Sequence, residues 1–162
     1  MSDELKSILL GLSAIYIVAI IALILTILNY NIKFEQEKLD RIVKIFLAGI
    51  VIQSFHFIEE FLTGFHILYP QFLGLSPWSS EFFVGFNLSW IIIWLVSVIG
   101  IRHYFQPAFF PLWFFAIGMT LNLVAHPLLA IANNGYFPGL TTSPFVGIFG
   151  IVLLQKLNDA KN

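Results

Sequence analysis

The chain begins its first long apolar stretch at Ile8, and residues 8–28 read ILLGLSAIYIVAIIALILTIL without a charged side chain. A helix needs about 20 apolar residues to cross the hydrocarbon core of a bilayer. The acidic residues Asp3 and Glu4 precede the stretch, whereas a cleaved signal peptide begins with positive charge. We therefore predict that residues 8–28 form a retained membrane-spanning helix.

The rest of the chain has the same apolar character. Of its 162 residues, 59% are hydrophobic and 10% are charged, whereas soluble domains carry roughly 25% charged residues. A soluble fold of this length could not cover so much apolar surface with so few polar side chains. The sequence predicts an all-α transmembrane bundle of about five spans, in one domain over residues 1–162. The spans are expected at approximately 8–28, 42–65, 81–101, 108–131 and 143–157, with residues 66–80 as a loop at the membrane surface.

Positive charges alternate between the expected connections, and they gather on the cytoplasmic side of membrane proteins. The second and fourth connections contain no Lys or Arg. The first and third connections and the tail contain Lys33, Lys38, Arg41, Lys44, Arg102, Lys156 and Lys161. The alternation predicts a multi-pass protein of the cell membrane with its N-terminus outside and its C-terminus inside.

Charge and cysteine content exclude some kinds of site. The formal net charge is -1 and no basic patch is present, so the sequence gives no argument for a nucleic-acid partner. The chain contains no cysteine, which excludes disulfides and thiolate metal sites.

Three of the expected spans carry polar side chains that are costly at membrane depth. With about 1.5 Å of rise per residue, these side chains fall in one layer in the outer half of the bilayer. We expect their helices to turn the polar faces toward each other, because lipid would leave them unsatisfied. The polar residues are Gln53, His56, Glu59 and Glu60 on the second span, Asn87 on the third, and Asn122 and His126 on the fourth.

Imidazole and carboxylate groups are ordinary ligands of transition metals. We predict His56, Glu59 and His126 as ligands of a divalent ion (zinc, iron or manganese). Glu59 and Glu60 suit acid–base catalysis. Structural roles stay open beside these, because polar residues also bridge membrane helices through hydrogen bonds. This alternative applies to His126, Asn87 and Asn122, and an interfacial position applies to the two glutamates.

Three motifs in order, His56-Phe57-Ile58-Glu59-Glu60, then His126, then Tyr136-Phe137-Pro138-Gly139, resemble the HXXEE family of small bacterial and archaeal membrane proteins. The resemblance extends from the second span through the fourth connection. It implies a functional set of His56, Glu59, Glu60, His126, Tyr136, Pro138 and Gly139. It implies no reaction, because the activity of the family is uncharacterised.

Position relative to the polar layer adds two expectations. Gln53, Asn87 and Asn122 join Tyr136, Pro138 and Gly139 as residues that contact a substrate or support the ligands. The Tyr-x-Pro-Gly segment is expected to form an outer loop over the polar layer, where Tyr136 could donate a hydrogen bond to a carboxylate.

Three classes of function fit this pattern. The first is a metal-dependent membrane enzyme that acts on a lipid-like substrate. The second is a protein that binds or transports an ion, a proton or a small molecule. The third is a structural membrane protein whose polar layer only stabilises helix packing. Membrane lipids are the expected partners in each case, and a homo-oligomer stays open.

Overall fold

The computed structural model describes residues 3–30 and 33–159. Within these two ranges the chain forms helices and turns and contains no strand, so the all-α prediction is confirmed. In chain order the helices are α1 (Asp3–Gly11), α2 (Ser13–Leu28), α3 (Gln36–Leu62), α4 (Phe65–Phe72), α5 (Ser80–Arg102), the 3-10 turn η1 (Gln106–Ala108), α6 (Phe109–Ala132) and α7 (Ser143–Asp159).

Among the described residues, three helices are long and apolar enough to cross a membrane: α3, α5 and η1 with α6. The bent pair α1 and α2 makes a fourth if it counts as one span. Helix α7 has 17 residues, which is at the short end of the length range of membrane spans, and it is not among these candidates. The structure therefore supports three or four spans, and the predicted count of about five is not confirmed.

The expected helix over residues 8–28 is broken at Leu12, where α1 and α2 meet at an angle of 46°. The break frees the carbonyl oxygen of Gly11, which accepts a hydrogen bond from the Tyr69 hydroxyl at 3.1 Å. Trp78 packs so closely on Gly11 that an added Cβ would lie 2.5 Å from its ring. The bend is therefore formed by contacts with distant residues, which the local sequence does not reveal.

The segment expected as a surface loop begins with helix α4. Pro70 lies inside this helix and cannot donate to the carbonyl of His66. The Trp78 amide takes its place and donates to the His66 oxygen at 2.9 Å. Phe65 and Tyr69 stack along α4, with ring centroids 4.9 Å apart. A tertiary partner for the orphaned carbonyl thus permits a helix where proline indicated a loop.

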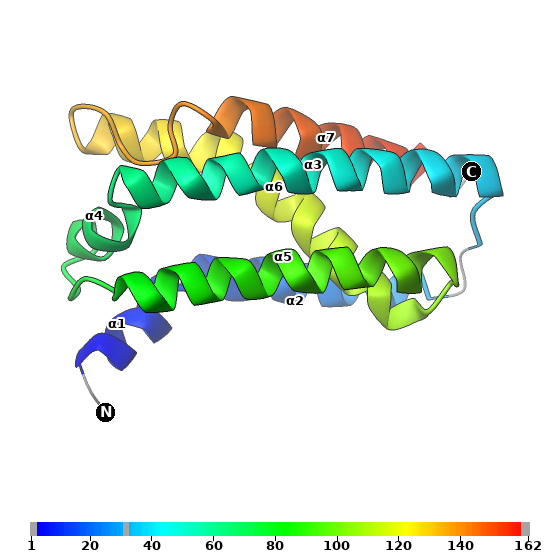
Figure 1. Ribbon diagram of the computed structural model, residues 1–162, viewed down its shortest axis with the longest axis horizontal. Helices are drawn as coiled ribbons and strands as arrows, with labels where there is room; N and C mark the ends of the chain where they lie inside the picture. The colour runs from blue at the N-terminus through cyan, green and yellow to red at the C-terminus, as the bar shows by residue number, and fades with distance from the viewer. Residues whose placement is uncertain (1–2, 31–32, 160–162) are drawn as a thin grey trace.

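Figure 1 shows α3 and α7 together on one side, α2 and α5 on the other, and α6 running obliquely between them. Helices α1 and α4 and the 133–142 connection lie at one end of the molecule. Arg102 and Asp40 form an ion pair of 3.3 Å at the opposite end, so the first and third connections share that end. Lys161, counted above among the positive residues, lies outside the described residues.

Helix α7 packs very closely on α6 at two glycines, Gly147 and Gly150. A Cβ on Gly150 would lie 2.5 Å from the backbone nitrogen of Thr120, and one on Gly147 would lie 3.1 Å from the Cα of Leu123. This close approach draws the connection between the two helices, residues 133–142, back across the end of α3. We call residues 133–142 the capping loop.

The outward faces of the long helices are apolar. Large hydrophobic side chains remain exposed along α2, α3, α5 and α6, including Ile17, Ile20, Ile27, Val51, Phe55, Ile58, Leu88, Ile92, Val96, Val124 and Leu128. Apolar bands on several faces are expected for helices surrounded by lipid, and they agree with the hydropathy of the sequence.

Candidate metal centre

Two histidines and one glutamate meet inside the bundle, in a cluster that we call the His/Glu group. His56 and Glu60 are one turn apart on α3, and His126 comes from α6. Their exposed fractions are 1%, 6% and 3%. The Oε1 atom of Glu60 lies 3.5 Å from Nε2 of His56 and 3.5 Å from Nε2 of His126. The three potential ligand atoms all lie within 4.8 Å of one another.

The proton on His126 is placed by its partner. Its Nδ1 lies 2.7 Å from the carbonyl oxygen of Pro138, and a carbonyl oxygen can only accept a hydrogen bond. Nδ1 therefore carries the hydrogen, and in the neutral ring the lone pair of Nε2 is turned toward Glu60. Metal-binding histidines usually have such a partner on their second nitrogen.

His56 is oriented in the same way through a hydroxyl group. Its Nδ1 lies 2.6 Å from Oγ1 of Thr142, and the Thr142 hydroxyl donates to Oε2 of Glu59 at 2.5 Å. Because the Thr142 hydroxyl already donates its hydrogen to Glu59, its oxygen accepts a hydrogen bond from the Nδ1–H of His56. The Nε2 atom of His56 then carries a lone pair, and it has no hydrogen-bond partner among the described residues.

Two imidazole nitrogens and a carboxylate oxygen thus lie within 4.8 Å of one another. Ligand atoms that lie about 2.0–2.2 Å from a tetrahedral ion are about 3.3–3.6 Å from each other. The two separations of 3.5 Å between Glu60 and the histidines fall in this range. The residues therefore fit a divalent ion in their chemistry, their orientation and two of their three separations.

Glu59 lies outside the His/Glu group and binds the capping loop. Its carboxylate accepts hydrogen bonds from the Tyr136 hydroxyl at 2.6 Å, the Thr141 amide at 2.9 Å and the Thr142 amide at 2.8 Å, in addition to the Thr142 hydroxyl. The two amides directly precede α7, where a helix N-terminus favours negative charge. The ligand set predicted from the sequence contained Glu59, and the geometry instead places Glu60 beside both histidines.

The Tyr-x-Pro-Gly segment covers the polar residues, as expected. Tyr136 makes the expected hydrogen bond to a carboxylate, that of Glu59. Partial burial and this hydrogen bond raise the pKa of the Tyr136 hydroxyl, so it stays a donor. Phe137 is fully buried and packs edge-on against Phe65 and Phe72. Each of these contacts holds the loop against α3 and α4.

Pro138 and Gly139 complete the segment by contacting the histidines. The Pro138 carbonyl accepts the hydrogen bond of His126. Gly139 has φ of +87°, and a Cβ there would lie 2.6 Å from Nδ1 of His126 and 2.9 Å from Cε1 of His56. Only glycine combines this backbone conformation with room for both rings.

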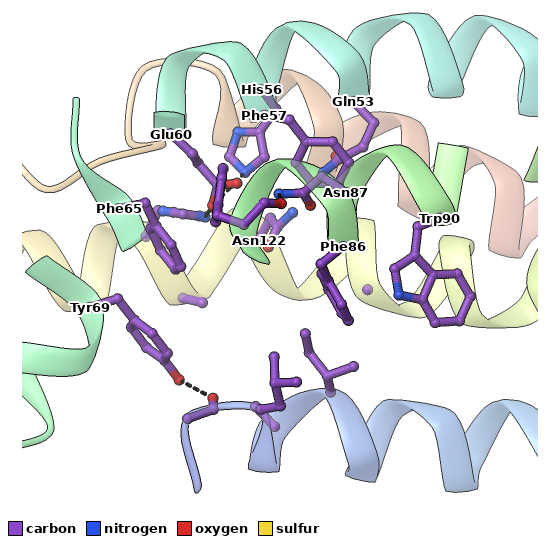
Figure 2. A pocket seen from close by; sticks show the side chains of 18 of the residues that line it. Gln53, His56, Phe57, Glu60, Phe65, Tyr69, Phe86, Asn87, Trp90 and Asn122 are labelled. Carbon is purple, nitrogen blue, oxygen red and sulfur yellow. Dashed lines mark hydrogen bonds and ion pairs between the residues drawn. The ribbon is translucent and has the colours of Figure 1, made fainter. Parts of the chain in front are cut away.

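Gln53, Asn87 and Asn122 line one cavity together with the His/Glu group. The cavity has a volume of about 220 Å³. Figure 2 shows Asn87 and Asn122 between the His56–Glu60 pair and the rings of Phe86 and Trp90, with Gln53 beside Phe57. Side chains from all three helices of the predicted polar layer therefore meet at one cavity.

Sequence reasoning missed Thr142, which connects Glu59 to His56. Its signal was weak: two threonines, Thr141 and Thr142, directly before the last helix. Threonine there is ordinarily explained as a helix cap. Its contact with α3 depends on how the capping loop folds back.

Comparisons with known proteins gave one match. A family described as protein of unknown function with HXXEE motif matches residues 46–153. This range contains the His/Glu group, Glu59 and the capping loop, and it leaves out α1 and α2. Neither the curated proteins nor the solved structures contain a match to the chain.

Proposed function

The chain belongs to the HXXEE family, whose function is unknown, and we propose that it is a metal-dependent membrane enzyme that hydrolyses a lipid-like substrate. One observation carries the proposal. Nε2 of His56, Nε2 of His126 and Oε1 of Glu60 converge beside a cavity that the same residues line.

The ligand set favours a catalytic ion over a structural one. Structural zinc sites have four protein ligands, whereas catalytic sites have three and leave one position open. Here the chain offers two imidazoles and one carboxylate, and the cavity adjoins them. The same ligands suit iron and manganese. An ion at such a site acts as a Lewis acid on a carbonyl and activates water.

The residues of the chain have separate tasks in this proposal. The Pro138 carbonyl orients His126, and Glu59 orients His56 through Thr142. We assign the second carboxylate oxygen of Glu60 as the proton acceptor. In the reaction, water adds to the substrate carbonyl carbon and the bond from that carbon to the leaving oxygen or nitrogen breaks. One proton of the water passes through Glu60 to the leaving group.

We further propose that the five-span arrangement holds, with α1 and α2 as one bent span and α7 as the last. The N-terminus is then outside and the C-terminus inside. The ion pair between Asp40 and Arg102 supports a common inner end for the first and third connections. The His/Glu group then lies toward the outer face.

Cysteine labelling tests this topology, because the chain has no cysteine of its own. In intact cells, an impermeant maleimide should modify Asp3→Cys and Asn134→Cys but not Asp159→Cys. An even number of spans would place Asp3 and Asp159 on the same side, and equal labelling of both would overturn the five-span proposal.

Metal content tests the enzyme proposal. We expect protein that is purified in detergent, stripped with a chelator and reloaded to retain zinc, iron or manganese. His56→Ala and His126→Ala should abolish metal retention. His103→Ala should not change it, because His103 directly follows α5 at the end of the bundle opposite the His/Glu group. Equal metal content in all four proteins would overturn the proposed site.

A further inference from the structure

We infer that the cavity binds a single-chain amphiphile with an N–H or O–H donor between its reacting carbonyl and its alkyl chain. An N-acyl amino-acid ester is the simplest member of this class. The inference rests on the proposed function, because it places the reacting carbonyl at the His/Glu group. It adds to that function the class of substrate that the site would select.

The need for a hydrogen-bond donor in the substrate is inferred from Gln53. This side chain is 1% exposed, and its Oε1 has no hydrogen-bond partner among the described residues. A buried carbonyl oxygen without a donor is unfavourable, and such groups are rare in folded proteins. Gln53 also lines the cavity. A ligand that brings an N–H or O–H to this position would satisfy it.

Two further amides border the same space from other helices. Asn87 comes from α5 and donates one N–H to the Phe83 carbonyl at 3.0 Å, and Asn122 comes from α6. Amide side chains do not ionise near neutral pH and recognise ligands by hydrogen bonds. These three side chains therefore suit binding of a polar group beside the reacting centre.

The deeper part of the cavity is aromatic. Trp90 and Trp94 line it from α5 and Phe114 lines it from α6. From Asn87 to Trp94 the helix rises about 10 Å, so the aromatic walls extend well beyond the amides. Apart from the Nε1 of Trp94, which has no hydrogen-bond partner among the described residues, these rings offer apolar surface that suits an alkyl chain.

The volume of the cavity limits the number of alkyl chains that a ligand can place in it. The cavity of about 220 Å³ exceeds a cavity of about 150 Å³ that admits benzene. It is smaller than the roughly 300–1,000 Å³ of most drug-sized ligand sites. One chain segment fits this space and a pair of acyl chains does not.

Figure 2 shows the order of these parts: the His56–Glu60 pair, then the amides, then Phe86 and Trp90. A ligand that follows this order has its carbonyl at one end, a hydrogen-bond donor next, and a chain beyond. Diacyl lipids do not have this order, because no donor separates their ester carbonyls from their chains.

A pair of probes measures the contribution of the N–H donor to binding. The first is an N-acylglycine methyl ester with bromine at the chain end, and the second is its N-methyl counterpart, which lacks the N–H. Bromine quenches tryptophan fluorescence on contact, and Trp90 and Trp94 lie where the chain would be. The full chain in lipid nanodiscs should bind the first probe roughly tenfold more tightly, the loss expected for one buried hydrogen bond.

Two variants test whether the preference for the N–H probe originates at Gln53. Gln53→Leu should make the two probes bind alike, while Gln71→Leu, an exposed glutamine on α4, should keep the difference. Replacing both Trp90 and Trp94 with phenylalanine should remove the saturable quenching. Equal binding of the probes to the unmodified protein would overturn the inference, since a water molecule would then satisfy Gln53. That comparison holds even if Gln53→Leu fails to fold.

Chelator-treated protein separates this inference from the proposed function. The probe preference depends on Gln53 and should persist without metal. If metal content fails its test and the preference persists, the binding site stands and the enzyme proposal falls. If metal is retained and the preference is absent, the substrate class is overturned alone.

Discussion

At one end of the bundle Asp40 and Arg102 form an ion pair of 3.3 Å with side chains 39% and 48% exposed, whereas at the other end Glu60 is 6% exposed and lies 3.5 Å from each of two histidines. Water screens the exposed ion pair, so neither partner depends strongly on the other. The buried carboxylate depends on its protein neighbours instead, because burial without a partner is costly. Charge at the exposed end therefore bears on orientation in the membrane, and charge at the buried end requires specific neighbours.

The capping loop provides most of those neighbours. It supplies the Pro138 carbonyl to His126, the Thr142 hydroxyl to His56 and four hydrogen bonds to Glu59. The exposed end has no comparable structure among the described residues. Substitutions should therefore have large effects in the loop and small effects at the exposed end.

Gly139→Ala should have the largest effect. The left-handed backbone alone costs an alanine about 1–2 kcal/mol, and the new methyl group would overlap both histidine rings. We expect loss of metal retention and a lower thermal unfolding temperature in detergent. Gly135→Ala is the matched control, because a Cβ there meets nothing within 4 Å. If the two variants behaved alike, the close contact of loop and histidines would be contradicted.

Glu59→Gln should weaken metal binding without abolishing it. The amide keeps the size of the side chain but replaces one accepting oxygen by a donor, which opposes either the Thr141 amide or the Thr142 amide. Loss of a residue that orients a ligand typically weakens metal affinity by about 10–100-fold. Competition with a chelator of known affinity measures this.

Glu60→Gln is the comparison that sharpens this result. It removes a ligand and should abolish metal retention rather than weaken it. The reverse order of severity would restore the ligand set of His56, Glu59 and His126 expected from the sequence.

Tyr136→Phe should have a smaller effect. It removes one of four hydrogen bonds to Glu59, and the ring is 48% exposed. We expect metal affinity to fall by less than about tenfold, because the remaining three donors still orient the carboxylate. Tyr16→Phe on α2 is the control, and isothermal titration with zinc is the measurement. A loss as large as that of Glu59→Gln would show that the tyrosine has a direct role at the metal.

Arg102→Gln should have the smallest effect. Exposed ion pairs contribute about 0–1 kcal/mol, so thermal unfolding should change little and less still at high salt. Metal retention should equal that of the unmodified protein. A large loss of either would end the contrast between the two ends of the bundle.

Much of this molecule was predictable from residue type and spacing. Helices over α3, α5 and α6 follow from apolar stretches that must satisfy their own backbone in lipid. His56 and Glu60 are four residues apart and so share a face of α3. The prediction of one polar layer needed only helix direction and rise.

The choice between Glu59 and Glu60 was not predictable in this way. Both residues lie within one turn of His56, and either can reach an ion near it. The amides of Thr141 and Thr142 draw Glu59 toward the start of α7. The bend at Leu12 and helix α4 likewise depend on Tyr69 and Trp78, which contact distant parts of the chain.

By itself, then, the sequence determined the helical class, the positions of the long helices and the polar layer, because the period and length of apolar stretches are local properties. The bent first helix, the role of each glutamate and the part played by Thr142 were decided by the tertiary structure. The reason is physical: a carboxylate or carbonyl oxygen points toward the donors that satisfy it. Here those donors come from residues such as Trp78, Tyr136 and Thr142, which only the folded chain brings near.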